Sequence, residues 1–421
     1  MPNLRLLLDW TLYRLALLLA APLIPLRLLW RGRRERGYLQ HWGERLALGP
    51  IPAPGALWIH AVSVGEMRAA QPLIAALRDA HPDAPMLLTC MTSTGRATAE
   101  ALYGSFARIV YLPYDYAGAM RRFMRRVRPR VGILMETELW PNLVHAAARA
   151  AVPLVLANAR LSERSARGYA RVPALTRACL QRIAVIAAQT EADAARLQKL
   201  GADATHVTGN LKFEIAPPPA QLERGAAWKA QWGPRPVLLA ASTREGEEAP
   251  LLRAFAAAAP AAVLLALVPR HPQRFDEVAG LIEAAGLAYQ RRSALDGAPL
   301  DPRTRVLLGD SLGELFAYYA ASDVAFVGGS LAPLGGQNLI EAASVGRPVL
   351  VGPYTFNFEE ATRLAIEAGA ALRVRDADDL LASALRLLAD APACTRMGEA
   401  GLAFAAHHRG AAARVAKLVP F

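Results

Sequence analysis

Short apolar runs alternate with amphipathic segments along most of the chain. Between residues 57 and 208, seven runs have the length and composition of buried strands, and the segments between them carry apolar residues at helical spacing. Strands that alternate with helices predict a doubly wound α/β domain with a parallel sheet. The predicted strands are residues 57–62, 86–89, 109–112, 131–135, 152–157, 185–188 and 206–208, and residues 67–80 are one of the predicted helices.

A second series of the same kind comes after the proline-rich stretch "APPPAQLERG" at residues 216–225, which has the composition of a linker. Two doubly wound domains joined by a linker predict a deep cleft, with ligands at the carboxyl ends of the strands. The residues that directly follow each strand are therefore the candidates for chemistry. The strands predicted here are residues 237–241, 263–268, 306–308, 324–327, 348–351 and 371–374.

The first 30 residues have a different pattern. They are rich in leucine, but the longest uncharged run, residues 15–26, has 12 residues and is short against the ~20 needed to span a bilayer. Positive charge directly after such a segment places the downstream chain on the cytoplasmic side. We interpret the segment as an uncleaved membrane anchor that spans or lies in the inner leaflet, and an amphipathic helix packed on the protein is the alternative. The charge comes from Arg31, Arg33, Arg34 and Arg36.

Composition narrows the class of partner. The 421 residues are 53% hydrophobic and 20% charged, which allows two or three domains with large cores. A net charge of +12 favours an anionic partner: nucleic acid, acidic lipid or a phosphorylated substrate. The cysteines, Cys90, Cys179 and Cys394, lack CxxC spacing and are interpreted as core residues in a reducing compartment. Asp376-Ala-Asp378 is similar to the DxD of metal-dependent sugar transferases, but its polar surroundings favour a loop and a helix start.

Carboxylates follow two predicted strands of the first domain. Ser63-Val64-Gly65-Glu66 has the spacing of a helix capping box, yet it lies where a strand turns into a helix and active-site residues collect. From the residues alone, Glu66 is either a cap or a catalytic base. Glu136 and Glu138 end another strand, and on an extended chain only one of them faces the cleft. Lys212 follows the last strand, beside the linker.

The second domain offers three candidate loops. Arg270 follows a predicted strand and could bind a phosphate or carboxylate through two hydrogen bonds. The alternative is an ordinary surface arginine. Ser311-Leu312-Gly313-Glu314 again has capping-box spacing. In "FVGGSLAPLGGQNLIEA" a glycine loop precedes a helix start near Asn338, where free N–H groups favour a phosphate, and Glu341 could bind ribose hydroxyls. The basic run at residues 120–130 is either a solvated face or a contact for anionic headgroups.

Taken together, these stretches resemble the 3-deoxy-D-manno-octulosonic acid (Kdo) transferases of Gram-negative lipopolysaccharide synthesis. The resemblance implies a GT-B fold of two Rossmann-like domains. It also implies a metal-independent, inverting glycosyltransferase that moves Kdo from CMP-Kdo to a phosphorylated lipid A precursor (lipid IVA). No cofactor and no nucleic acid partner are implied. The pieces, in order from about residue 35 to 370, are "WIHAVSVGE", "ETELWPN", "NARLSERSARGY", "GNLKFE", "VPRHPQRF", "FVGGSL…GGQNLIEA" and "GPYTFNFEEA".

The resemblance also implies roles for individual residues. Glu66 would be the general base, with Ser63 still capping, and Glu136 and Lys212 would steady the transition state. Gln337 stands where the family often has histidine, and Leu339 where proline is common. The residues implied for CMP are Pro269, Arg270, Leu312, Gly313, Glu314, Asn338, Leu339, Ile340 and Glu341.

The resulting prediction divides the chain into three parts. Residues 1–36 are the anchor with its basic flank, residues 37–217 the acceptor-binding domain and residues 218–421 the CMP-Kdo-binding domain. The enzyme would lie at the inner membrane with its catalytic domains on the cytoplasmic side. One alternative is a nucleotide-sugar epimerase, which would need no anchor. Another is a membrane-tethered nucleotide-sugar binding protein, which would need no catalytic carboxylate.

Overall fold

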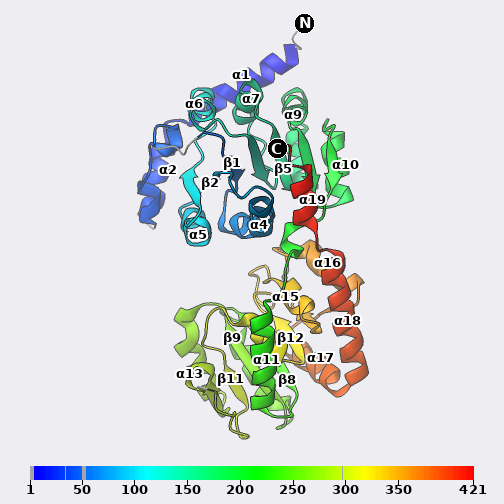
Figure 1. The fold of residues 1–421 in the computed structure, drawn as a ribbon. Coiled ribbons are helices and arrows are strands. Elements are labelled where there is room, and N and C mark those ends of the chain that lie inside the picture. Colours follow the sequence, from blue (N-terminus) through cyan, green and yellow to red (C-terminus); the bar gives the residue numbers. More distant parts are fainter. Residues whose placement is uncertain (1–3, 34, 50–53, 296) are drawn as a thin grey trace. The chain divides into compact units, whose positions relative to one another are not determined.

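The computed structural model describes residues 4–33, 35–49, 54–295 and 297–421. The chain forms two compact units, one of Met1–Glu214 with Gly410–Phe421 and the other of Ile215–Arg409. Each unit contains a seven-stranded parallel sheet covered by helices (Figure 1). The predicted α/β class with two parallel sheets is therefore confirmed.

In the first unit the strand order is β3-β2-β1-β4-β5-β6-β7, and every neighbouring pair is parallel. All seven predicted strands are present, with ends that differ by a few residues. Chain order reverses between β1 and β4, so their carboxyl ends form the switch point where doubly wound sheets bind ligands. The strands are β1 (Leu57–His60), β2 (Met86–Cys90), β3 (Ala107–Tyr111), β4 (Val131–Met135), β5 (Leu154–Ala159), β6 (Val185–Ala188) and β7 (Thr205–Val207).

Alternate residues of these strands pack into two hydrophobic cores, one on each face of the sheet. Trp58 and Leu87 pack with α6, α7, α9 and α10, whereas Leu57 and Ile59 pack with α4, α5 and α19. The predicted helix at residues 67–80 is two helices, because Pro72 lies in the first turn of a new one. The helices are α3 (Val64–Ala69), α4 (Gln71–Ala80), α5 (Ser93–Tyr103), α6 (Ala117–Val127), α7 (Pro141–Arg149), α8 (Glu163–Tyr169), α9 (Pro173–Leu180), α10 (Glu191–Lys199) and α19 (Ala411–Leu418).

The N-terminal segment forms two helices, α1 (Leu4–Ala20) and α2 (Leu23–Gly32), which bend by 49° at their junction. Among the described residues no single helix is long and apolar enough to cross a membrane, although this bent pair together passes the same test of length and composition. Arg34 of the predicted basic cluster lies outside the described residues.

Helix α1 is attached to the first unit along one side. The Asp9 carboxylate accepts a hydrogen bond from the N–H of Leu175 in α9 (3.3 Å), and the Tyr13 hydroxyl donates to Asp115 (2.7 Å). Most of the remaining surface of α1 and α2 is apolar and open to solvent, with Arg5, Arg14 and Arg27 also exposed. The exposed large hydrophobic side chains are Leu4, Leu7, Leu8, Leu12, Leu15, Leu18, Leu19, Leu23, Leu26, Leu29 and Trp30.

In the second unit the strand order is β10-β11-β9-β8-β12-β13-β14, with the switch point between β8 and β12. The six predicted strands are present. Strand β10 was not predicted, because its three residues, "YQR", do not form an apolar run. The strands are β8 (Val237–Thr243), β9 (Leu264–Pro269), β10 (Tyr289–Arg291), β11 (Val306–Leu308), β12 (Val324–Val327), β13 (Val349–Val351) and β14 (Ala371–Arg373).

The proline-rich linker prediction is partly wrong. Helix α11 already begins at Pro219, because proline is tolerated in the first turn, and its buried Trp228 and Trp232 pack near Tyr318 of α14. The helices of this unit are α11 (Pro219–Trp232), α12 (Glu248–Ala258), α13 (Phe275–Ala284), α14 (Leu315–Ala321), α15 (Leu339–Ser344), α16 (Glu359–Glu367), α17 (Ala377–Ala389) and α18 (Ala391–His407).

The end of the chain packs with the first unit, although the sequence assigned residues 218–421 to the second domain. The Glu214 carboxylate accepts hydrogen bonds from the N–H groups of Gly410 (3.0 Å) and Ala412 (3.2 Å), at the start of α19. Arg414 of α19 also donates from Nε to the Thr208 carbonyl (2.9 Å). The two bonds to Glu214 satisfy N–H groups that a helix start leaves open, and all three bonds fix α19 to the loop after β7.

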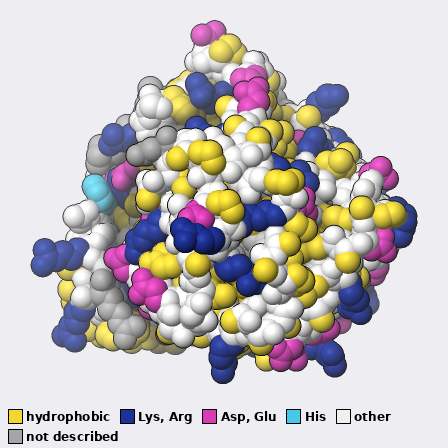
Figure 2. Space-filling model, turned by 90° about the horizontal axis from the view of Figure 1, so that it is seen from below, with side chains coloured by type: hydrophobic (Ala, Val, Ile, Leu, Met, Phe, Trp, Pro, Cys, Tyr) yellow, Lys and Arg dark blue, Asp and Glu magenta, His cyan; other side chains and the backbone are white. Residues whose placement is uncertain are grey.

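Basic and acidic side chains are mixed on the face shown in Figure 2, where Lys and Arg lie next to Asp and Glu at several places. The positive side chains on this face are thus interspersed with carboxylates. Such a surface is typical of a protein exposed to water.

Candidate functional site

Glu66 lies at the switch point of the first sheet, in the first turn of α3. Its Oε2 accepts a hydrogen bond from the Val62 N–H (2.7 Å), and its Oε1 accepts one from the Ser63 hydroxyl (3.1 Å). The predicted capping box is therefore wrong in detail: the Ser63 side chain makes no cap bond to the helix backbone and turns to Glu66 instead. The carboxylate thus has two donors that fix its orientation.

The pKa of Glu66 is raised to about 7. Burial is the main cause, and the negative charges of Glu136 and Glu138 add to it, while the hydrogen bonds from Val62 and Ser63 oppose it. Carboxylates from the loops after β1 and β4 therefore interact electrostatically at this edge. A carboxylate with a pKa near neutrality can accept a proton at physiological pH.

Glu136 and Lys212, predicted on separate loops, form an ion pair in the structure. The Lys212 Nζ lies 3.5 Å from Glu136 Oε1, and both side chains are about 30% exposed. Glu136 has a φ of 57°, a left-handed conformation that glutamate rarely adopts. Such strain is often found at functional sites, where surrounding contacts hold it.

Glu138 does not alternate with Glu136 as on an extended chain, because Glu136 breaks the extended conformation. The Glu138 carboxylate accepts a hydrogen bond from the Trp140 indole N–H, and burial raises its pKa. Glu136 carries the ion pair with Lys212.

Asn158 supports this pair and has no role in the sequence prediction. It is fully buried near the end of β5 with a φ of 56°, and its Oδ1 accepts a hydrogen bond from the N–H of Leu211, the residue before Lys212. The carbonyl of the preceding residue, Ala157, accepts one from the Glu136 N–H (2.9 Å). Asn158 is the first residue of "NARLSERSARGY", one of the stretches that carry the family resemblance, but the sequence prediction gave this residue no role.

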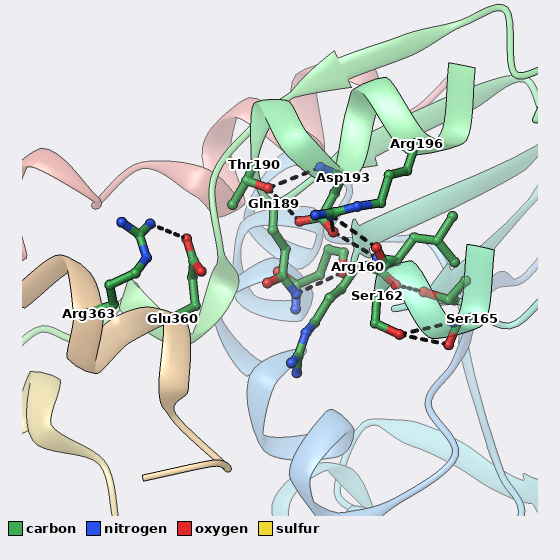
Figure 3. A network of polar contacts seen from close by, with 12 residues as sticks. Arg160, Ser162, Ser165, Gln189, Thr190, Asp193, Arg196, Glu360 and Arg363 are labelled. Carbon is green, nitrogen blue, oxygen red and sulfur yellow. Dashed lines mark hydrogen bonds and ion pairs between the residues drawn. The ribbon is translucent and has the colours of Figure 1, made fainter. Parts of the chain in front are cut away.

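The rest of that stretch forms a network after β5 (Figure 3). The Leu161 N–H donates to Asp193 Oδ1 (2.8 Å), and the Thr190 hydroxyl donates to Asp193 Oδ2 (2.6 Å). Gln189 donates to the Asn158 carbonyl (3.0 Å). These bonds tie the loop after β5 to the loop after β6.

In the second unit a buried carboxylate holds the glycine loop. Glu247 is fully buried and accepts hydrogen bonds from the N–H groups of Gly329 (2.7 Å), Ser330 (2.9 Å), Leu331 (2.8 Å) and Arg244 (2.8 Å). The sequence prediction missed Glu247, although the acidic stretch "REGEE" directly follows the strand β8. The carboxylate fixes the loop that connects β12 to α15.

The predicted nucleotide-binding residues near this loop lie at the start of α15. Asn338 caps the helix, accepting from the Ile340 N–H (3.1 Å), so the predicted helix start is confirmed. Leu339 and Ile340 have buried side chains, which leaves only their backbone groups for a ligand. Asn338 Nδ2 donates to Glu341 Oε1 at 3.4 Å.

Arg270 is exposed at the end of β9, directly after the buried Pro269. The pKa of the neighbouring His271 is lowered, first by burial and then by the positive charges of Arg244, Arg270 and Arg274. Arg274 is bound to Glu248 (2.6 Å). Arg244, which the prediction missed, therefore lies with Arg270 in a cationic group at the carboxyl ends of β8 and β9.

The capping box predicted for residues 311–314 does not form. Helix α14 begins at Leu315 without a side-chain cap, and the Ser311 hydroxyl contacts the Tyr318 hydroxyl (3.0 Å). Glu314 pairs with Arg224 (2.9 Å) and Arg292 (3.5 Å). Leu312 and Gly313 are exposed, and Gly313 has a φ of 77°.

The other motif predictions concern metals and cysteines. Asp376 caps α17 by accepting from the Asp379 N–H (2.9 Å), which confirms the interpretation of the DxD stretch as a helix start. Within the described part of the chain, no group of three or more His, Cys, Asp or Glu side chains is arranged to hold a metal ion. Cys90, Cys179 and Cys394 are free thiols, the first two of them buried.

Comparison with known proteins identifies the family. The family described as "3-Deoxy-D-manno-octulosonic-acid transferase (kdotransferase)" matches residues 40–215. The 3-deoxy-D-manno-octulosonic acid transferase of Bordetella pertussis is 50% identical, covering 96% of each chain, and that of Haemophilus influenzae is 37% identical, covering 97% of each. A glycosyltransferase from Rickettsia africae has a similar fold, with 12% identity, a TM-score of 0.55, and coverage of 87% of this chain and 97% of its own. The chain therefore belongs to the 3-deoxy-D-manno-octulosonic acid transferase family of glycosyltransferases.

Proposed function

We propose that this glycosyltransferase moves Kdo from CMP-Kdo to a phosphorylated lipid A precursor, with inversion at the anomeric carbon and without a metal ion. The observation that carries the proposal is the Glu66 carboxylate, with a pKa of about 7, beside the Glu136–Lys212 pair at the switch point of the first sheet. Family membership supports the sugar, and the chemistry of these side chains supports the mechanism.

Glu66 is the proposed general base. Inversion requires one base to take the proton of the acceptor hydroxyl while the bond from the anomeric carbon to the donor phosphate breaks. The raised pKa makes the ionised carboxylate a stronger base than an ordinary glutamate. The Val62 N–H and the Ser63 hydroxyl orient the carboxylate, so that little rearrangement is needed when the proton is transferred.

Glu136 and Lys212 are proposed to steady the charges that develop during transfer. The Lys212 ammonium can stabilise negative charge, and Glu136, held in a left-handed conformation, fixes the position of that ammonium. Positive charge developing on the sugar ring would be stabilised by the carboxylates of the same edge.

The second unit is proposed to bind the CMP part of the donor. Arg270 and the neighbouring Arg244 supply positive charge for its phosphate. Glu247 holds the glycine loop beside them through the N–H groups of Gly329, Ser330 and Leu331. Glu341, in the first turn of α15, is proposed to bind the ribose hydroxyls. Cationic side chains can take the charge of the leaving CMP, so the proposed reaction needs no metal.

Helices α1 and α2 are proposed to attach the enzyme to the cytoplasmic face of the inner membrane. Their leucines form an exposed apolar surface, and Arg31, Arg33 and Arg36 beside it suit anionic headgroups. Because Asp9 and Tyr13 bind α1 lengthwise to the first unit, we favour a helix that lies in the leaflet over one that spans it.

The test is to incubate the full-length protein with CMP-Kdo and a tetraacylated lipid A precursor, and to analyse the lipid by mass spectrometry. A lipid heavier by Kdo, formed in EDTA as well as in its absence, is expected. Failure to form it would overturn the proposed function, and loss of transfer in EDTA with rescue by magnesium would overturn the metal-free mechanism alone. An epimerase would change a nucleotide sugar without the lipid, and a binding protein would change neither.

A further inference from the structure

The loop after β5 has a fixed backbone and one guanidinium without a partner. The Thr137 hydroxyl donates to the Arg160 carbonyl, and both backbone groups of Leu161 are bonded, its N–H to Asp193 (2.8 Å) and its carbonyl to Arg196 (3.1 Å). The Arg160 side chain is exposed, and no described residue pairs with its guanidinium. Figure 3 shows this side chain extending away from the network, with no interaction drawn at its charged end.

A second arginine in the same network, Arg196, has a structural role and serves as a comparison. Arg196 donates to the Leu161 carbonyl and lies 3.4 Å from Asp193 Oδ1, so its guanidinium is used to hold the loop. The Arg160 guanidinium contributes nothing to that network. Thr137 holds the Arg160 carbonyl, and Asp193 and Arg196 hold the backbone of the next residue, while the charge of Arg160 stays available.

Arg160 is placed at the edge where the proposed chemistry occurs. It directly follows β5, which lies next to β4, and its carbonyl is bonded to Thr137, the neighbour of Glu136. Glu66, Glu136 and Glu138 make this edge acidic. Lys212 is paired with Glu136 and is already proposed to stabilise one negative charge of the reaction, so a further anionic substrate group at this edge would be balanced by another cation.

Building on the proposed transfer reaction, we propose that Arg160 is a substrate-binding residue that forms a charged fork with an anionic oxygen group of the substrate. The planar guanidinium suits both a phosphate and a carboxylate. A phosphate would come from the lipid acceptor, and a carboxylate from the Kdo moiety of the donor. Because the backbone at Arg160 is already held, little conformational freedom is lost on binding.

The experiment measures steady-state kinetics of the full-length enzyme with each substrate varied while the other is saturating. The variants are Arg160→Ala, Arg160→Lys and the control Arg149→Ala, an exposed arginine at the end of α7, at the opposite edge of the same sheet. Arg160→Ala is expected to raise the KM of one substrate by about 10- to 100-fold. Arg160→Lys should recover part of this loss because it keeps the charge, and Arg149→Ala should behave as the wild type.

The two substrates identify the anion. If the acceptor KM rises, a precursor lacking one phosphate should be bound equally well by wild type and Arg160→Ala, whereas a rise in the donor KM assigns the carboxylate. An unchanged KM for both substrates, or an equal effect of Arg149→Ala, would overturn the inference while transfer by the wild type upholds the proposed function. If the wild type transfers no Kdo, the proposed function falls, and this inference with it.

Discussion

Lys212 Nζ lies 3.5 Å from Glu136 Oε1, although the two residues come after different strands, β7 and β4. Two hydrogen bonds bring them together: the Glu136 N–H donates to the Ala157 carbonyl, and the Asn158 side-chain Oδ1 accepts from the N–H of Leu211. The strand β5 thus connects both loops. The negative charge of Glu136 in turn raises the pKa of Glu66, so the three predicted catalytic residues are linked electrostatically.

The substitution Glu66→Gln distinguishes a catalytic base from a residue with only a structural role. Glutamine keeps an amide oxygen that can accept the Val62 N–H, so near-normal folding and unchanged CMP affinity are expected. It cannot take a proton, and turnover should fall by ~100- to 10,000-fold. The measurements are single-turnover rates, thermal unfolding and CMP titration.

The control for this experiment is Ser63→Ala. It removes one hydrogen bond to the Glu66 carboxylate, which is worth about 0.5–1.5 kcal/mol of stability, but it keeps the base. Substantial transfer by a well-folded Glu66→Gln enzyme would contradict the assignment and leave Glu66 with a structural role.

Glu136→Gln should shift the pH dependence of the reaction. The Glu136 charge disfavours ionised Glu66, so removing it lowers the pKa of Glu66 from its value of about 7. The base is then ionised at lower pH, and the acidic limb of kcat/KM against pH moves to lower pH, whatever the loss in absolute rate. Glu163→Gln, an exposed carboxylate in α8, is the control and should leave the limb in place. A limb that stays near its wild-type position in Glu136→Gln would argue against this electrostatic coupling.

Arg270→Ala and Glu341→Ala should weaken CMP binding. Loss of a hydrogen bond to a charged group costs roughly 1.5–3 kcal/mol, or about ten- to a hundred-fold in affinity. Calorimetric titration of CMP checks this, with Arg253→Ala as the control, because Arg253 is an exposed arginine in the middle of α12. Unchanged affinity in both variants would move the nucleotide site elsewhere.

Replacing three exposed leucines of α1, Leu8, Leu15 and Leu19, with glutamine should release the protein from membranes. These side chains are 50–70% exposed, so the fold should be retained. The measurement is flotation with vesicles that contain anionic lipid, compared with Leu102→Gln, an exposed leucine of α5. Deleting residues 1–30 should also release the protein, at least at high salt, but it removes the Asp9 and Tyr13 contacts as well. An intact protein that is fully soluble without detergent would exclude the anchor.

The sequence by itself determined most of the secondary structure and the family. All predicted strands are present because most of them are apolar runs that become buried, although the edge strands β7 and β14 are largely exposed. Among the described residues, only the short polar strand β10 was missed. The sequence also placed Glu66, Glu136 and Lys212 after strands, because the end of an apolar run marks the end of a buried strand. It misplaced local details, such as the capping roles of Ser63 and Ser311, because a serine hydroxyl can choose a side-chain partner over the helix backbone.

Only the tertiary structure decided how these residues act on one another. The local sequence pattern does not predict the order of the strands in the sheet. The observed order places β1 beside β4, and so brings the loops of Glu66 and Glu136 to one switch point. The pKa of Glu66 depends on burial and on charges from distant positions, and the left-handed conformation of Glu136 depends on contacts that hold it. The packing of α19 on the first unit likewise depends on Glu214, nearly 200 positions earlier. These features arise from groups far apart in the chain, whose proximity exists only once the chain has folded.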